Sequence, residues 1–223
     1  MCLSVISNGK RKVYGCNFDI SMMESRVSIH GSGVFIEAFD KTVGWIPLFG
    51  AGQKRIFVTM PTCWPYDKRS DYREGDVNIV NISVDLLLGK RTFEDVRYLV
   101  SNDMICSIPS ITFQGHCADR EGNVLRYTPH VGWEYLEKPL FSVMSNFSPF
   151  KDAEGMGRNR FERAEEIFYA CNDFDVDECF HLLSECSMTA PPTKASLVFT
   201  PEDGTVYWCE DREWNKIKSA IIK

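Results

Sequence analysis

The sequence predicts an α+β fold in which antiparallel β-sheets are covered by helices. Two observations predict it. Segments rich in β-forming residues come in pairs joined by short turns, as in antiparallel hairpins. Segments with helical periodicity come in two pairs between them. The order along the chain is strands, a helix pair, strands, a second helix pair and a terminal hairpin, which is typical of a layered sandwich.

The chain opens with a predicted hairpin formed by residues 2–6 and 13–19. The Asn8-Gly9 pair between them is the strongest short-range hairpin signal, because both residues tolerate positive φ. Further strands are expected in segments of similar composition, and turns at 119–122 and 201–204 join the later hairpins. These strands are residues 27–29, 34–39, 55–60, 111–118, 124–128, 140–144, 195–199 and 205–209.

The first helix pair is expected over residues 79–88 and 92–100. The first segment is apolar enough for a buried helix and ends at Gly89. Thr92, with Asp95 three residues later, resembles a capping box, in which each residue bonds the other's backbone N–H. These two features predict where one helix ends and the next begins.

The second helix pair begins near Arg160 and at Asp175. Apolar residues from Phe161 to Cys171 recur at helical spacing, and a second apolar stripe follows Asp175. Cysteines 171, 179 and 186 fall on these stripes, so we expect them to be core residues rather than metal ligands.

Length and composition indicate one soluble domain over residues 1–223. Hydrophobic residues make up 44% of the chain, which is enough for a continuous core, and no linker divides it. No apolar run approaches the ~18 residues that a membrane-spanning helix needs. The net charge is −6 and the basic residues are scattered. Neither a nucleic acid nor a membrane is therefore expected as a partner, and a homo-oligomer is left open.

The nine cysteines indicate a reducing compartment. Their number is odd, and the chain does not start with a charged segment followed by an apolar one, so nothing directs it to secretion. We therefore expect reduced thiols and a cytoplasmic location. The chain has no CxxC pair, and Cys179, His181 and Cys186 lack the paired ligand sets of a zinc site. No metal and no cofactor are predicted.

Cys2 is the strongest nucleophile candidate. Removal of Met1 would give it a free α-amine, which titrates near ~7.7–8.0 in model systems. One residue would then supply a thiol nucleophile and an amine base. The alternative is a strand thiol that follows Met1 by chance. The four histidines belong to no local signature of a Ser-His or Cys-His enzyme.

Several segments, in order, resemble the choloylglycine hydrolase and penicillin V acylase family of N-terminal nucleophile hydrolases, which cleave linear amide C–N bonds. The terminal hairpin at 195–209 fits this family as well. The segments that carry the resemblance are Met1-Cys-Leu-Ser-Val5, Val13-Tyr-Gly-Cys-Asn-Phe-Asp19, Leu86-Leu-Leu-Gly-Lys-Arg-Thr-Phe-Glu-Asp-Val96, His116-Cys-Ala-Asp-Arg-Glu-Gly122, Val143-Met-Ser-Asn-Phe-Ser-Pro149 and Arg160-Phe-Glu-Arg-Ala164.

The resemblance implies a four-layer αββα sandwich of two stacked antiparallel sheets. It also implies four catalytic residues that converge in one cavity. Cys2 would be the nucleophile and Asp19 would hold its α-amine. Asn146 would donate to the oxyanion, and Arg160 would lower the pKa of the thiol. The alternatives are a turn-capping aspartate, an asparagine at a strand end and an arginine paired with acids along a helix.

Two positions depart from the family pattern. Cys16 stands where the family has an arginine, and Gly52 aligns with an asparagine that lines the oxyanion site. The leading hypothesis is an amidase that works through a thioester at Cys2. The second is a protein that keeps the fold but only binds its ligand, and the third is a thiol-based redox sensor or metal binder.

The implied partner is a small-molecule N-acyl amide. Bile-salt amides, phenoxyacetyl amides, acyl-homoserine lactones and other N-acyl compounds all stay open. Apolar and aromatic side chains in loops after the early strands are candidates for the acyl pocket, although ordinary packing explains each of them equally well. These candidates are Met22, Met23, Phe49, Trp64 and Tyr66.

Overall fold

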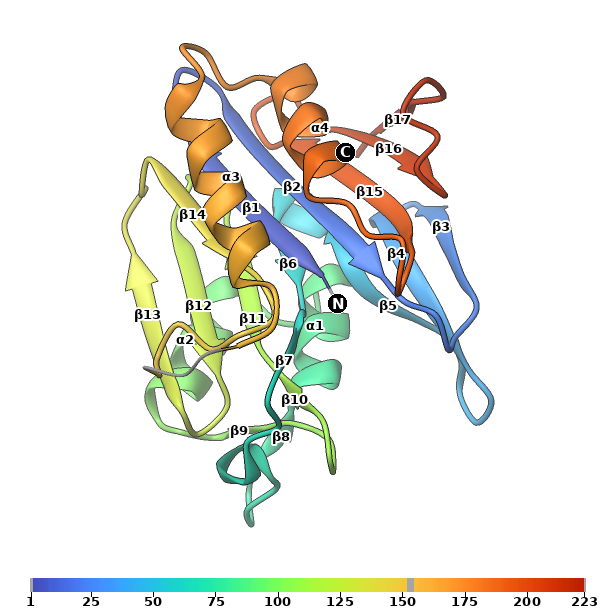
Figure 1. The fold of residues 1–223 in the computed structure, drawn as a ribbon. Coiled ribbons are helices and arrows are strands. Elements are labelled where there is room, and N and C mark those ends of the chain that lie inside the picture. Colours follow the sequence, from blue (N-terminus) through green and yellow to red (C-terminus); the bar gives the residue numbers. More distant parts are fainter. Residues whose placement is uncertain (1, 152–154, 223) are drawn as a thin grey trace.

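A computed structural model describes residues 2–151 and 155–222 of the chain. Two large antiparallel sheets pack face to face, and helices cover the outer face of each (Figure 1). The expected α+β class and the αββα layer order are therefore confirmed. No helix among the described residues is long and apolar enough to cross a membrane.

The first sheet contains the start and the end of the chain. Its strand order is β14-β1-β2-β15-β16-β17, so the opening hairpin lies between the strand that precedes the second helix pair and the terminal hairpin. All of its pairings are antiparallel. The strands are β1 (Leu3–Asn8), β2 (Lys12–Asp19), β14 (Phe141–Met144), β15 (Thr193–Thr200), β16 (Thr205–Glu210) and β17 (Lys218–Ile221).

The second sheet has the order β13-β12-β11-β6-β5-β4-β3 and is antiparallel throughout. Two small pairs lie beside it, β7 (Thr62–Cys63) with β10 (Thr112–Phe113), and β8 (Val77–Asn78) with β9 (Ile105–Cys106). The long strands are β3 (Ser25–His30), β4 (Gly33–Asp40), β5 (Gly44–Ala51), β6 (Phe57–Thr59), β11 (Gly115–Ala118), β12 (Val124–Thr128) and β13 (Gly132–Leu136).

Each helix pair covers one sheet. Helices α1 (Ile79–Leu87) and α2 (Phe93–Ser101) contact the second sheet, and α3 (Arg158–Ala170) and α4 (Val176–Glu185) lie across β1, β2, β14 and β15 (Figure 1). Both halves of the predicted capping box at Thr92 are present. The side chain of Asp175 accepts a hydrogen bond from the Glu178 backbone N–H at the start of α4. The capping residues that predict the starts of α2 and α4 therefore make the expected hydrogen bonds.

Three strands of the two large sheets, β5, β13 and β17, are not predicted from the sequence, and neither are the short strands β7, β8 and β9. Pro47 interrupts the β5 segment, and the pairing with β4 shifts register beside it. Ile36 pairs with Phe49 and Glu37 with Pro47, so Leu48 is an extra residue in β5. A bulge of this kind tolerates a proline that a regular ladder excludes. Strand β17 is an exposed edge strand without an apolar face.

The opening hairpin forms as predicted, but its turn is different. Asn8 pairs with Lys12, so the loop has three residues and neither Asn8 nor Gly9 lies in the left-handed region. The Asn8 side chain instead donates to the backbone carbonyls of Gly122 and Pro139, at 2.9 and 2.8 Å. These bonds tie the end of β1 to loops of the second sheet and of the segment that precedes β14.

The space between the sheets is filled mainly by apolar and aromatic side chains. From β2, Tyr14, Cys16 and Phe18 point into this core, while alternate residues face α3 and α4. Tyr14 packs against Phe57 and Phe199 with ring centroids 5.8 and 6.1 Å apart. This alternation fixes which side chains of β1 and β2 meet the second sheet.

One histidine crosses this apolar layer. His116 of β11 is fully buried, and its two ring nitrogens lie 2.8 Å from the Ser4 hydroxyl and 2.9 Å from the Ser142 hydroxyl. Ser4 belongs to β1 and Ser142 to β14, so a side chain of the second sheet joins two adjacent strands of the first. Burial lowers the pKa of His116 well below its ordinary value of 6.5, which keeps the ring neutral.

His116 makes stability depend on pH. Below about pH 6.5 the unfolded chain binds a proton at this ring and the native chain does not. This group therefore lowers the free energy of unfolding by up to ~1.4 kcal/mol for each unit by which the pH is decreased. We expect the wild type to lose more stability than His116→Gln between pH 7 and pH 5 in urea unfolding. Parallel pH curves for the two proteins would contradict a neutral buried ring.

Candidate functional site

The structure brings Cys2, Asp19, Asn146 and Arg160 together, although 158 positions separate the first from the last. Cys2 directly precedes β1 and Asp19 ends β2. Asn146 follows β14, and Arg160 lies in the first turn of α3. All four residues are buried. The strand order explains why these four residues lie together, because β14, β1 and β2 are neighbours in the sheet and α3 crosses them.

The backbone nitrogen of Cys2 is bound by Asn146. It donates a hydrogen bond of 2.8 Å to the Asn146 Oδ1. The same oxygen accepts a 2.6 Å bond from the Arg160 guanidinium. The Asn146 Nδ2 donates in turn to the Thr62 carbonyl and hydroxyl oxygens, at 2.6 and 3.2 Å. The Asn146 carboxamide therefore joins β1, β7 and α3 at the point where the α-nitrogen of Cys2 lies.

A buried ion pair anchors α3 to the end of β2. The Arg160 guanidinium donates to the Asp19 Oδ2 at 2.8 Å, and the Thr193 hydroxyl donates to the Oδ1 at 2.6 Å. Burial raises the pKa of Asp19, while Thr193 and Arg160 oppose the rise. In the structure the Asp19 carboxylate binds Arg160 and Thr193, and the Asn146 Oδ1 accepts from the Cys2 nitrogen.

A glycine lets α3 approach Asn146 closely. Gly157, immediately before α3, has φ +86°, a conformation that favours glycine. A Cβ at this position would meet the Ser145 hydroxyl, the Arg160 guanidinium and the Asn146 backbone nitrogen. A side chain here would therefore push the first turn of α3 away from the site.

The Cys2 thiol is less acidic than the resemblance implies. Burial raises its pKa to about 11, although the Asp19 backbone N–H and the Arg160 charge both lower it. Arg160 lowers the thiol pKa, as expected. Desolvation of the thiolate raises it by more, so the net change in pKa is upward.

The two departures from the family pattern lie in different places. Cys16 is fully buried between the sheets, opposite Ser4 in the β1–β2 ladder, where an arginine would have to lose its hydration. Gly52 follows β5, where its backbone N–H bonds the Ile56 carbonyl and an added Cβ would meet the backbone of Leu87 in α1. Ile56, the partner of Gly52, lies just before β6. Thr62, the partner of Asn146, lies after β6 in β7, so the two contacts are at opposite ends of β6. The expected position of Gly52 beside the oxyanion is therefore wrong.

The candidate pocket residues do not form one group. Phe49 is buried between the sheets, with its ring 5.2 Å from that of Phe18. Met22 is 93% exposed. Trp64, partly exposed, donates from its backbone N–H to the Asn146 carbonyl at 2.7 Å, which places it beside the site. Thr62 and Thr193, which the sequence prediction misses, contact the site directly. Isolated threonines carry no sequence signal that distinguishes them from other strand residues.

A cavity of about 470 Å³ reaches the outer side of the site. Arg160 lines it together with residues of the segment before α3 and of the segment after α4. Met156 and Met188 supply apolar surface, and Glu185 supplies a carboxylate that pairs with Arg163. Arg160, whose guanidinium contacts both Asp19 and Asn146, is thus the one residue of the cluster that also lines this cavity.

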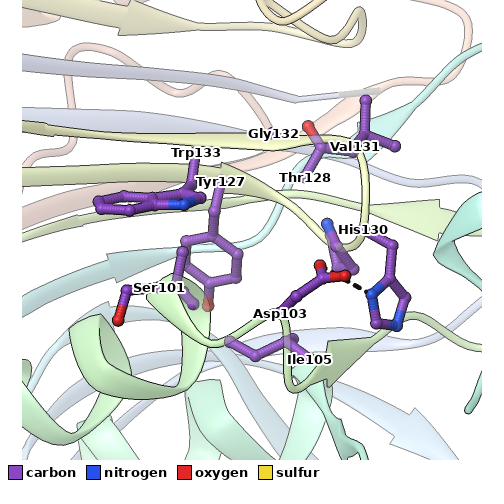
Figure 2. A pocket seen from close by; sticks show the side chains of 11 residues that line it. Ser101, Asp103, Ile105, Tyr127, Thr128, His130, Val131, Gly132 and Trp133 are labelled. Carbon is purple, nitrogen blue, oxygen red and sulfur yellow. Dashed lines mark hydrogen bonds and ion pairs between the residues drawn. The ribbon is translucent and has the colours of Figure 1, made fainter.

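A second cavity, of about 210 Å³, lies between the end of α2 and the β12–β13 hairpin (Figure 2). His130 projects toward Asp103 there, and its side chain is fully buried. Its ring nitrogens lie 2.9 Å from Asp103 and 2.8 Å from Asp76. Because both nitrogens already face carboxylates, this histidine has no free nitrogen with which to act as a base.

A metal centre finds no support in the described residues, where no group of three or more His, Cys, Asp or Glu side chains is arranged to hold an ion. Eight of the nine cysteines are buried, as expected for most of them. Cys171, which follows α3, is partly exposed and so departs from the core position expected for it.

Comparisons with solved structures identify the fold. The C2A mutant of the conjugated bile acid hydrolase from Clostridium perfringens superposes with a TM-score of 0.71 at 16% identity, over 99% of this chain and 92% of that one. Another variant of that enzyme gives 0.70 at 17% identity, with the same coverage. The chain shares their fold. Penicillin V acylase from Agrobacterium tumefaciens matches with a TM-score of 0.65 at 12% identity, over 94% of this chain and 83% of that one. No protein-family profile and no curated protein sequence matches the chain.

The buried pair Asp19–Arg160 predicts a non-additive effect on stability. Arg160→Gln removes a cation from the buried Asp19 carboxylate, which costs about 3–5 kcal/mol. Asp19→Asn in the same chain removes the carboxylate charge that Arg160 pairs with, so the double variant should be more stable than Arg160→Gln alone. Urea unfolding of the four proteins of this cycle measures the coupling. Strictly additive losses would show that the two side chains do not interact.

Proposed function

We propose that the protein is an amidase that hydrolyses a linear, non-peptidic C–N amide bond through a thioester at Cys2. The observation that carries the proposal is the contact between the Cys2 nitrogen and Asn146, in a buried cluster that also holds Asp19 and Arg160. The fold supports it, because the similar structures are a bile acid hydrolase and a penicillin acylase. The mutated residue in one of them is also a cysteine at position 2.

The first step is removal of Met1, which converts the Cys2 backbone amide into an α-amine. The Asn146 Oδ1 accepts from this nitrogen at 2.8 Å and holds it in place. One hydrogen of the nitrogen is then fixed, and the lone pair is left to take the proton of the neighbouring thiol. An amine is a base near neutral pH, whereas the peptide nitrogen before cleavage is not. Maturation therefore creates the base without moving a side chain.

In the acylation step, the Cys2 sulfur forms a bond to the substrate carbonyl carbon. The thiol proton passes to the α-amine, and from there to the leaving nitrogen as the C–N bond breaks. Arg160 and the Asp19 backbone N–H favour the thiolate during transfer, because both lower the thiol pKa. In the second step a water oxygen attacks the thioester carbon, the S–C bond breaks, and the carboxylic acid leaves with the thiol restored.

The second candidate is a binding protein that keeps the fold without catalysis. The burial of the Cys2 thiol, with its pKa raised to about 11, favours this candidate as long as Met1 is attached. The two candidates differ in the chemistry of the matured protein. An amidase turns over its ligand after Met1 is removed, whereas a binding protein retains it unchanged.

Activity is expected only in Met1-free protein. A panel of N-acyl amides that includes phenoxyacetyl, bile-salt and acyl-homoserine lactone compounds should yield at least one substrate for this form. Cys2→Ala should lower turnover by at least ~10³-fold, because the nucleophile is lost. The matched control is Cys171→Ala, a change at the partly exposed cysteine, which should leave turnover unchanged. Activity that survives Cys2→Ala would contradict the mechanism.

Alkylation of Cys2 should depend steeply on pH in protein that retains Met1. With a thiol pKa of about 11, the thiolate fraction and hence the rate with iodoacetamide rise about tenfold per pH unit from pH 7 to pH 9. Peptide mass spectrometry measures the rate at each cysteine. Cys171 serves as the accessible reference and should be labelled faster at pH 7. A pH-independent rate at Cys2 would argue against a protonated, buried thiol.

A further inference from the structure

A buried hydroxyl without a hydrogen-bond partner lies at the cavity between α2 and the β12–β13 hairpin. Tyr127 of β12 is only 1% exposed, and its side chain lines this cavity. Figure 2 shows the phenol ring pointing from β12 into the space that the lining side chains surround. Within the described part of the chain, its hydroxyl makes no hydrogen bond. Because an unpaired buried hydroxyl is costly, this group calls for a partner from outside the chain.

The fold makes room for the phenol at a glycine. Gly115 of β11 lies directly opposite Tyr127 in the β11–β12 ladder, and a Cβ there would overlap the far end of the phenol ring. The ring therefore lies over a position of β11 that only glycine leaves open. Burial raises the pKa of Tyr127 well above its ordinary value of 10. The hydroxyl thus keeps its hydrogen and can donate it.

The walls beside this hydroxyl are apolar and aromatic. Val100 and Ile105 are buried and line the cavity together with the indole of Trp133. Trp133 is 43% exposed, so it borders solvent, whereas Tyr127 lies at the buried end. The volume of about 210 Å³ is larger than the ~150 Å³ of an apolar cavity that holds benzene. An aromatic ring with a small substituent therefore fits.

The acidic and basic side chains at the cavity are already paired. The His130 ring nitrogens lie 2.9 Å from Asp103 Oδ1 and 2.8 Å from Asp76 Oδ2. Arg73 donates to the other Asp103 oxygen at 2.9 Å. These contacts favour a ligand without charge, since neither carboxylate needs a further cation. They also hold the β12–β13 turn against the end of α2, so the cavity is formed before a ligand binds.

We propose that this cavity binds a small uncharged aromatic carbonyl compound, whose oxygen accepts a hydrogen bond from the Tyr127 hydroxyl. The aromatic ring of the ligand lies against Val100, Ile105 and Trp133, and its carbonyl group points to the buried end. The site is separate from the cluster at Cys2, because none of the four residues of that cluster lines this cavity. The inference therefore does not rest on the proposed function.

Acetophenone is the probe, because it has an aromatic ring, a carbonyl oxygen and no charge or amide bond. In NMR titrations it should shift the backbone amide signals of residues 100–105 and 128–133, with a Kd of ~1 mM or lower. Tyr127→Phe keeps the ring and removes the donor, so it should raise the Kd ~3–10-fold. The matched control is Tyr98→Phe, which removes an exposed hydroxyl of α2 outside the cavity and should leave the Kd unchanged.

Urea unfolding gives Tyr127→Phe a second readout. Because the hydroxyl makes no hydrogen bond in the ligand-free protein, its removal should leave the unfolding midpoint unchanged or raise it. An excess of acetophenone should then stabilise the wild type more than the variant, since the wild type binds it more tightly.

Four results would overturn the inference. The first two are absence of saturable acetophenone binding, and an equal Kd for the wild type and Tyr127→Phe. The third is a set of amide shifts around Cys2 in place of the cavity, which would assign the ligand to the catalytic cluster. The fourth is a lower unfolding midpoint for ligand-free Tyr127→Phe, which would mean that the hydroxyl has a partner within the protein. The outcome for the amidase mechanism is independent of all four.

Discussion

The side chain of Asn146 is the junction on which the candidate site depends. It accepts from the Cys2 nitrogen and from Arg160, and it donates to Thr62. Buried polar groups have to be paired, so each of these contacts constrains the element that supplies it. The start of β1, the first turn of α3 and the short strand β7 are thereby held around one carboxamide. The nucleophile candidate is held at this junction through its backbone nitrogen.

The rest of the fold maintains this junction. His116 bonds β1 to β14 from the opposite sheet, so the strands that lead from Cys2 and to Asn146 keep their spacing. The Asp19–Arg160 pair holds α3 against the end of β2. Both devices place polar groups where apolar ones would pack at lower cost, and buried ion pairs in general add little net stability. Their contribution is better understood as geometric, because they determine where the helix and the strands meet.

The sequence predicts the layers and the four residues of the candidate site, but not their contacts. Hairpin turns and helix caps are local, which is why the capping box at Thr92 forms as predicted. Strand β5 is missed because it contains Pro47, which is accommodated beside a bulge in β5 that forms only when the strand pairs with β4. The position of Gly52 is wrong because similarity of short segments does not fix register. Thr62 and Asn146 are 84 positions apart in the chain, so no local pattern identifies their contact.

The most direct measurement is acylation of Met1-free protein by p-nitrophenyl phenylacetate, followed by an acid quench and peptide mass spectrometry. We predict one phenylacetyl group, carried by the Cys2 peptide and released by hydroxylamine as expected for a thioester. Protein that retains Met1 should stay unmodified at Cys2, because its α-nitrogen is an amide. Acyl groups on Cys171 or on lysines, with Cys2 unmodified in the Met1-free protein, would contradict the central claim that this cysteine is the nucleophile.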